Sequence, residues 1–322
     1  MKIFNFVIYG SGNFFGVAYD ELNHFDDVLY LTSIQDVLKS GFGKMLYRIT
    51  FSPRLNSIIS LPFKNLTFKA ISSVRFNSSR PICFIFFSNQ YHLFNNGYLE
   101  YLKQRFPACK VVLYLQDLVK INIQLNIPVL KNKFDLILSY DKGDCAKYNL
   151  LYHPTPYSKI DIKSSENYPI CDVFFCGKAK TRFDTIYKVY KKLAGHGLNC
   201  CFIIVGLPEE QQINSPGLIY CDGISYLDNI RYELKAKCLL EIMQEEATGF
   251  TPRLWEAIMY DKHLLTNNSS VITSEYYVKE YHHSLEEIEN VEKWINKEVV
   301  YSDEQKRALS PSLLLKKIEA FF

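Results

Sequence analysis

The sequence contains no acidic residue between Val37 and Tyr98. The same stretch has eight basic residues set among Phe, Leu and Ile: Lys39, Lys44, Arg48, Arg54, Lys64, Lys69, Arg75 and Arg80. A surface of one sign attracts an anionic partner such as a phospholipid surface, a diphosphate or a nucleic acid. The alternative is a chance imbalance on a solvated face. No recognised nucleic-acid module accompanies the charge, so we expect no nucleic-acid partner.

Three further absences exclude classes of protein. The nine cysteines form no C-x-x-C pair and no ladder with histidine, so we expect buried thiols in a reducing cytosol, without disulfides or zinc. No apolar run is long enough to span a membrane. The first apolar run is cut by Asn5 and lacks a small-residue cleavage site, which indicates a first strand and not a signal peptide. No D-x-D motif stands in a strand context, and we expect no metal.

The chain of 322 residues, 48% of them hydrophobic and 22% charged, is long enough for two globular domains. Short apolar strand-like runs alternate with helical patterns in both halves, which predicts α/β domains with helices on both faces of a parallel sheet. Residues 152–169 are rich in Pro, Ser and charge. We therefore predict an N-terminal domain over 1–155, a C-terminal domain over 156–302, and a helix over 303–322 across their junction.

The stretch from Ala247 to Asn268, ATGFTPRLWEAIMYDKHLLTNN, directly follows the strand-like run CLLEIM. Thr251 is a good N-cap and Pro252 suits the first helical position, so we predict that a helix begins there. In an open parallel sheet, ligands bind at the carboxyl ends of strands. The free N–H groups of such a helix form an anion site before any side chain is counted.

Two side chains of this predicted helix suggest a nucleotide. Arg253 places a permanent cation in the first turn, where it opposes the helix dipole but suits a diphosphate. Glu256 lies on the same side and is able to accept hydrogen bonds from ribose hydroxyls. Thr248 and Gly249 precede the helix, and glycine permits close backbone approach. The alternative is an Arg253–Glu256 surface pair that only stabilises the helix.

This pattern resembles the nucleotide-sugar site of bacterial GT-B glycosyltransferases that build capsules, O-antigens and other surface polysaccharides. The resemblance implies two Rossmann-like domains facing across a cleft. It also implies that Arg253 contacts the donor phosphates, with Thr251 at the helix N-terminus, and that Glu256 binds the ribose. The donors of such enzymes are commonly UDP-linked, so the resemblance implies a UDP-sugar. We expect Arg253→Ala to cripple transfer without unfolding the protein.

A second segment, residues 172–193 (DVFFCGKAKTRFDTIYKVYKKL), is similar to the opening of the second domain of the same enzymes. The resemblance implies that Gly177, Lys178 and Arg182, together with Lys180, face the donor phosphate. A solvated basic loop explains these residues as well. By the same resemblance, Tyr226 lies near the base of the nucleotide. The first domain matches only in architecture.

Glycines follow the first predicted strand in the sequence GSGNFFG, at Gly10, Gly12 and Gly16. Their spacing is G-x-G-x-x-x-G, and the second predicted strand, residues 27–32, ends without the acid that binds a ribose. A nicotinamide site is therefore disfavoured. We expect this loop, with Gly12 and Asn13, to contact the acceptor.

Catalytic residues are less well defined. An inverting transferase needs a general base for the acceptor hydroxyl, whereas a retaining one relies largely on the leaving diphosphate. Asp117 follows a predicted strand directly and is the leading candidate base; Asp20 and Glu245 are the rivals. Each of the three is explained equally by a structural role. His92 is placed to contact acceptor hydroxyls, although a lone loop histidine is usually ordinary.

We therefore predict a glycosyltransferase that moves a sugar from a nucleotide-sugar donor to a lipid-linked oligosaccharide in surface polysaccharide synthesis. It would act in the cytoplasm, peripheral to the inner face of the cell membrane, with the basic region 37–98 against anionic lipid. It would use no cofactor besides its donor. Two alternatives remain open: a sugar-nucleotide epimerase of the same architecture, and a membrane-associated binding protein without chemistry.

Overall fold

The computed structural model describes residues 2–10, 12–31, 38, 40–52, 68, 71, 74–94, 97–121, 125–162, 167–243 and 249–322. The chain forms two compact units: unit 1 is Met1–Pro154 with Pro311–Phe322, and unit 2 is Thr155–Ser310. The two units therefore divide at 154/155 and 310/311, whereas the boundaries predicted from the sequence are 155/156 and 302/303.

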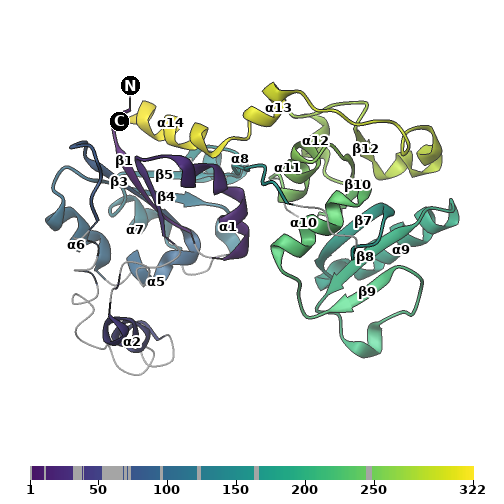
Figure 1. Ribbon diagram of the computed structural model, residues 1–322, viewed down its shortest axis with the longest axis horizontal. Coiled ribbons are helices and arrows are strands. Elements are labelled where there is room, and N and C mark those ends of the chain that lie inside the picture. The colour runs from purple at the N-terminus through teal and green to yellow at the C-terminus, as the bar shows by residue number, and fades with distance from the viewer. Residues whose placement is uncertain are drawn as a thin grey trace. The chain divides into compact units, whose positions relative to one another are not determined.

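Unit 1 is built on a parallel sheet with the strand order β2-β1-β3-β4-β5-β6 (Figure 1). Its strands are β1 (Asn5–Tyr9), β2 (Val28–Leu31), β3 (Ile82–Phe87), β4 (Lys110–Leu115), β5 (Leu136–Ser139) and β6 (Leu151–Tyr152). β3 and β4 are continuous apolar runs because helices cover both faces of a parallel sheet. Predicted runs cover β1 to β5, whereas the short β6 was not anticipated.

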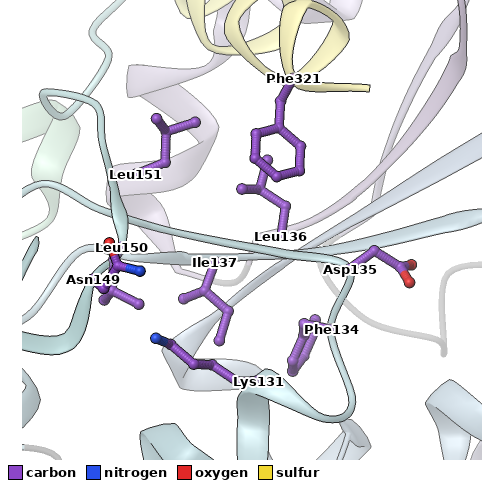
Figure 2. A pocket seen from close by; sticks show the side chains of 9 residues that line it. All are labelled: Lys131, Phe134, Asp135, Leu136, Ile137, Asn149, Leu150, Leu151 and Phe321. Atoms are coloured by element: carbon purple, nitrogen blue, oxygen red, sulfur yellow. The ribbon is translucent and has the colours of Figure 1, made fainter.

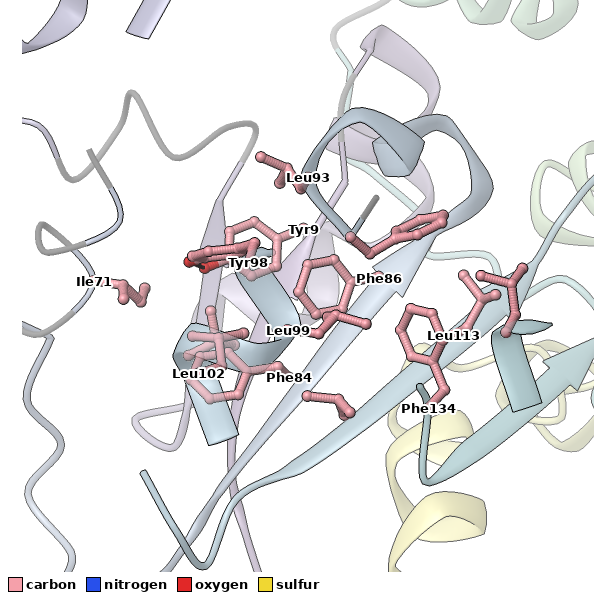
Figure 3. Packing of buried hydrophobic residues seen from close by; sticks show 14 of the residues in the cluster. Tyr9, Ile71, Phe84, Phe86, Leu93, Tyr98, Leu99, Leu102, Leu113 and Phe134 are labelled. Carbon is pink, nitrogen blue, oxygen red and sulfur yellow. Dashed lines mark hydrogen bonds between the residues drawn. The ribbon is translucent and has the colours of Figure 1, made fainter. Parts of the chain in front are cut away.

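The core of unit 1 is strongly aromatic (Figure 3). Tyr98 of α6 donates to or accepts from Tyr9 of β1 at 2.6 Å between hydroxyls, and the Tyr9 ring stacks on Phe86 of β3 at 4.9 Å. Leu99 and Leu102 of the same helix face the sheet as well. The helices of unit 1 are α1 (Asn13–Ala18), α2 (Gly41–Thr50), α5 (Tyr91–Phe94), α6 (Tyr98–Arg105), α7 (Ile127–Lys131), α8 (Lys142–Tyr148) and α14 (Pro311–Phe321).

The C-terminal residues return to the start of the chain. The Glu319 carboxylate of α14 accepts from the backbone N–H of Ile3 at 2.6 Å and of Phe4 at 3.2 Å, and the two termini lie side by side (Figure 1). The predicted helix over 303–322 is two helices, α13 (Asp303–Arg307) in unit 2 and α14 in unit 1. Pro311 separates them because its ring cannot continue a helix but suits a helical start.

Unit 2 repeats the design with the order β12-β11-β10-β7-β8-β9, again parallel throughout. In chain order within the unit this is 6-5-4-1-2-3, the Rossmann arrangement. The strands are β7 (Cys171–Lys178), β8 (Cys200–Val205), β9 (Leu218–Cys221), β10 (Ala236–Glu241), β11 (His263–Thr266) and β12 (His282–Ser284). The helices besides α13 are α9 (Phe183–Gly195), α10 (Tyr226–Leu234), α11 (Pro252–Met259) and α12 (Ser269–Ile272).

Both sheets have a point where the strand order reverses, between β1 and β3 in unit 1 and between β7 and β10 in unit 2. Loops leaving the two strands at such a point diverge to opposite faces, and the crevice between them is where open α/β sheets bind ligands. In the described part of the chain, no helix is both long and apolar enough to cross a membrane.

Candidate functional site

The candidate site lies at the carboxyl ends of β7 and β10, the reversal point of unit 2. Helix α11 begins there as the sequence predicts: Thr251 is its N-cap, accepting from the Arg253 backbone N–H at 3.2 Å, and Pro252 is its first residue. The helix is apolar on most sides, with Leu254, Trp255 and four further residues buried, so it is held firmly against the sheet.

Glu241 ends β10 and joins three elements. It is buried, and its two carboxylate oxygens accept from the Thr251 hydroxyl at the start of α11 and from the Thr266 hydroxyl at the end of β11. The Thr266 hydroxyl also accepts from the backbone N–H of Asn268 at 2.9 Å. Burial raises the pKa of the Glu241 carboxyl, and the two hydroxyl donors oppose that rise. Glu241 therefore sets where α11 starts relative to two strands.

Arg253 is not on the surface. Its side chain is 12% exposed, and its Nη1 lies against a Glu233 carboxylate oxygen and 2.9 Å from Glu256 Oε2. Its Nη2 donates to the backbone carbonyl of Cys176 in β7 at 3.2 Å. Burial lowers the pKa of Arg253, but attraction to Glu256 and Glu233 outweighs it and the pKa is raised. The Arg253–Glu256 pair exists, but it is a buried three-residue cluster, not a solvated pair.

Glu233, near the end of α10, is the residue of this cluster that the sequence did not indicate. It is fully buried, and it accepts from the Asn229 amide one turn earlier as well as from Arg253. Burial, then the nearby Glu256, raise its pKa well above the ordinary value for a glutamate, with Arg253 opposing. One guanidinium is thus shared by two carboxyl groups, and the proximity of Glu256 makes ionisation of Glu233 less favourable.

Tyr226 joins the same cluster from the start of α10. Its hydroxyl donates to Glu256 Oε1, and it lies 3.0 Å from the hydroxyl of Tyr157. Burial, followed by the proximity of Glu256, raises the pKa of Tyr226 well above its usual range. Glu256 is only 1% exposed; its Oε1 accepts from Tyr226, and its Oε2 forms an ion pair with Arg253.

The loop after β7 meets the loop after β10 through Arg182. The Arg182 guanidinium donates to the carbonyl of Ile242, which follows Glu241, and to the carbonyl of Lys178 at 2.6 Å. Burial lowers its pKa. Lys178 is exposed at the end of β7. A Cβ at Gly177 would lie 3.1 Å from the Phe175 ring and 3.7 Å from Arg182, so the loop packs closely at this glycine.

The predicted residues of unit 1 are not part of this cluster. Gly12 caps α1 at the carboxyl end of β1 with φ +102°, which favours glycine, and Asn13 begins that helix, exposed. Asp117 is exposed two residues beyond β4, at the carboxyl edge of the sheet. Asp20 lies in the turn of 3-10 helix Asp20–His24 that leads into the amino end of β2, accepting from Asn23 at 3.2 Å. That is the opposite edge of the sheet from Asp117.

Several predicted residues lie outside the described part of the chain: Glu245, Thr248 and the side chains of His92 and Lys180. Gly249 is described; its carbonyl accepts from the Asn268 amide at 3.2 Å. The structure thus brings together Tyr226, Thr251, Arg253 and Glu256 with the flanking Gly177 and Arg182. It adds Glu233 and Glu241, of which only Glu241 had a sequence signal, as a lone acid ending an apolar strand.

A pocket of about 430 Å³ lies elsewhere, in unit 1 (Figure 2). Phe321 of α14 reaches toward Leu136 of β5 on one side of it. Its carboxylate, Asp135, is already engaged with Lys103 at 3.2 Å and with the Val111 backbone N–H at 2.8 Å. None of the predicted site residues lines this pocket, whose walls combine apolar side chains with Lys131, Asp135 and Asn149.

Comparison with known proteins gives a likeness of fold. No protein-family model matches the sequence, and no curated protein matches it. Among solved structures, an alpha-glucosyltransferase in complex with UDP-glucose and DNA containing an abasic site superposes with a TM-score of 0.57 at 11% identity, covering 98% of both chains. A second structure of such an enzyme, with UDP and DNA containing an HMU base, superposes with a TM-score of 0.57 at 10% identity, again over 98% of both chains. A spinosyn rhamnosyltransferase superposes with a TM-score of 0.42 at 10% identity, covering 98% of this chain and 96% of that one.

At such identities the likeness concerns the fold alone. The predicted class, α/β with two Rossmann-like domains of the GT-B type, is confirmed by the two parallel six-stranded sheets and by the two glucosyltransferase structures.

Proposed function

We propose that the protein is a glycosyltransferase that transfers a sugar from a nucleotide-sugar donor bound by unit 2. The observation that carries the proposal is the position of Arg253, Glu256 and the N-terminus of α11 at the reversal point between β7 and β10. A helix N-terminus attracts a diphosphate, and a carboxylate beside it suits ribose hydroxyls. The two glucosyltransferase structures described above, which contain UDP-glucose and UDP, support the same class of donor.

The burial of Glu256 adds one condition to this proposal. A ribose hydroxyl that binds Glu256 Oε1 would take the place of the Tyr226 hydroxyl that now donates there. The exchange keeps the carboxylate satisfied, so its cost is small compared with leaving a buried oxygen unpaired. Arg253 would serve mainly by holding Glu256 in place, while exposed Lys178 and the α11 N–H groups meet the phosphates.

For the acceptor we propose a lipid-linked oligosaccharide of the kind used in capsule, O-antigen and other surface polysaccharide synthesis, met at the inner face of the cell membrane. The support is the resemblance of the 247–268 segment together with the acid-free stretch from Val37 to Tyr98. Asp117, at the carboxyl edge of the unit 1 sheet, is the proposed general base. The chemistry would need no metal and no cofactor besides the donor.

DNA is the second acceptor worth testing, because the two glucosyltransferases described above were solved with DNA. An acid-free basic stretch also suits a phosphate backbone. The absence of a recognised nucleic-acid motif, and an apolar surface described below, favour lipid.

The test is donor binding followed by transfer. UDP, GDP, dTDP, CMP and NAD are compared by thermal shift; one nucleoside diphosphate is expected to stabilise the protein by an amount that rises with its concentration. Glu256→Gln should reduce that shift, whereas Asp117→Asn should retain it and lose transfer. Transfer is then measured to a lipid-diphosphate oligosaccharide and to duplex DNA, with and without EDTA, and EDTA should make no difference.

Other outcomes identify the alternatives. A shift with NAD alone, or no shift with any nucleotide, contradicts the transferase. Conversion of the sugar nucleotide without acceptor indicates an epimerase, and transfer only to DNA replaces the lipid acceptor.

A further inference from the structure

Helix α2, residues Gly41–Thr50, exposes an apolar stripe. Phe42, Met45 and Ile49 are 72%, 55% and 41% exposed, and their spacing of three and four residues places them on one side of the helix. No other helix or strand in the described ranges exposes more than one large apolar side chain. Single exposed apolar residues are ordinary, but a continuous stripe along one helix indicates a contact surface.

The stripe is not the side by which α2 packs on the core of unit 1. The other side of α2 is packed: Tyr47 is buried and stacks on Phe51 at 4.7 Å. Phe51 lies 5.9 Å from the ring of Phe68, which lies 4.7 Å from Tyr98 of α6. This aromatic chain ties α2 to the core of unit 1, although Figure 1 draws the helix apart from the strands. The apolar stripe is therefore exposed on a helix whose other side is fixed to the core of unit 1.

Basic side chains flank the stripe. Lys44 and Arg48 are exposed and one turn apart, and at about 100° per residue they occupy the arc next to Met45. The surrounding sequence from Val37 to Tyr98 contains no acid. A helix that combines an exposed apolar stripe with adjacent Lys and Arg suits the boundary of an anionic bilayer. There the apolar groups enter the acyl region while the long basic stems extend to the headgroups.

We infer that α2 is the element that inserts into an anionic membrane surface, with Phe42, Met45 and Ile49 entering the bilayer and Lys44 and Arg48 at the headgroups. A second copy of the chain fits less well, because pairing two such faces would bring two acid-free basic surfaces together. A nucleic acid would use the basic groups but leave the stripe in water. Only an anionic lipid surface matches both the charge and the apolar side chains.

The biological role of this membrane contact rests on the proposed function, since an acceptor on a lipid carrier stays in the membrane. Binding of α2 to lipid does not itself depend on sugar transfer. Vesicle binding is measured without any nucleotide, so its failure leaves donor binding by unit 2 untouched, and failed donor binding leaves vesicle binding standing.

The experiment is co-sedimentation of the full chain with vesicles of phosphatidylcholine alone or mixed with phosphatidylglycerol. The wild type is expected to bind the anionic vesicles, and less strongly at high salt. Phe42→Ser/Met45→Ser/Ile49→Ser is expected to lower the affinity at least about tenfold. Lys44→Gln is expected to lower it about fivefold.

A matched control is available in unit 2. Ile170, Val300 and Ile272 are 72%, 61% and 42% exposed, nearly the same as the three residues of α2. Their triple serine variant should bind vesicles like the wild type. Near-UV circular dichroism checks that both triple variants are folded.

Three results would overturn the inference. The first is no binding of the wild type to anionic vesicles at low salt. The second is equal loss of binding in both triple variants. The third is a dimer, seen by analytical ultracentrifugation, that the α2 variant abolishes while vesicle binding is unchanged; that would assign the stripe to a second copy.

Discussion

At the scale of single residues, Arg253 is the side chain whose role the fold changes most. The sequence alone suggests a phosphate contact that is removable without loss of stability. In the structure its guanidinium neutralises two buried carboxyl groups, Glu233 and Glu256, and bonds a carbonyl of β7. Removing one partner of a buried ion pair leaves an uncompensated charge, which is far costlier than losing a surface pair.

We therefore expect Arg253→Ala to lower the free energy of unfolding by about 3–5 kcal/mol. Both tryptophans of the chain, Trp255 and Trp294, are in unit 2, so urea unfolding followed by tryptophan fluorescence reports on that unit. Arg231→Ala is the matched control, because the Arg231–Asp228 pair is 35% and 39% exposed and screened by solvent; it should change stability far less than Arg253→Ala.

A second substitution tests the reason. If the cost arises from two carboxyl groups left together, adding Glu233→Gln to Arg253→Ala should recover part of the lost unfolding free energy. Glutamine removes a potential charge and still accepts the hydrogen bond that the Asn229 side chain donates. Equal losses in Arg253→Ala and Arg231→Ala would mean that the cluster is not buried as described.

At the scale of elements, the start of α11 is fixed by Glu241 through one hydroxyl on the helix cap and one on β11. Thr266→Val keeps the shape of the side chain but leaves a Glu241 oxygen and the Asn268 N–H without their partner. We expect a loss of about 1–3 kcal/mol in unfolding free energy, and a weaker thermal shift by the donor nucleotide because the helix N-terminus moves.

The control for this prediction is Thr273→Val, in which an exposed hydroxyl with long bonds to Ser269 and Ser270 is removed. It should change stability by no more than about 0.5 kcal/mol. If Thr266→Val behaves in the same way, Glu241 does not hold α11.

At the scale of the whole molecule, stability should depend on pH through histidines buried in unit 2. Burial, followed by the proximity of neighbouring histidines, lowers the pKa of His282 from 6.5 to about 3 and that of His263 to about 4. His282 Nδ1 accepts from the Val278 N–H at 3.2 Å, and Nε2 lies 2.8 Å from the Tyr301 hydroxyl, so protonation breaks the Val278 bond. Each histidine therefore stabilises the fold fully above pH 6.5 and loses that contribution as pH falls towards its folded pKa.

The buried Glu233 and Glu241 act in the opposite sense, because their raised pKa values favour the fold at lower pH. The histidine contribution is therefore measured as a difference. Between pH 7.5 and pH 5, wild type should lose on the order of 2 kcal/mol more unfolding free energy than His282→Asn. Identical pH profiles of the two proteins, followed by tryptophan fluorescence, would contradict the assignment.

Much of this protein was predictable from local sequence. Continuous apolar runs such as residues 110–115 mark parallel strands, and the Thr251-Pro252 pair marks a helix start, because both signals are patterns of residues adjacent in sequence. The alternation of strands and helices along the chain determined the α/β class for the same reason. The basic, acid-free stretch was also evident.

The tertiary structure decided what these elements do together. Residue spacing places Arg253 and Glu256 on one side of a helix, but only the packing of α10 and β7 against α11 buries them and adds Glu233, twenty residues away in sequence. The exposed side of α2 was likewise hidden in a sequence where apolar residues normally indicate core. Burial is a property of contacts between distant segments, so the sequence by itself determined the elements, and the fold decided which charges are paired and which apolar side chains meet solvent.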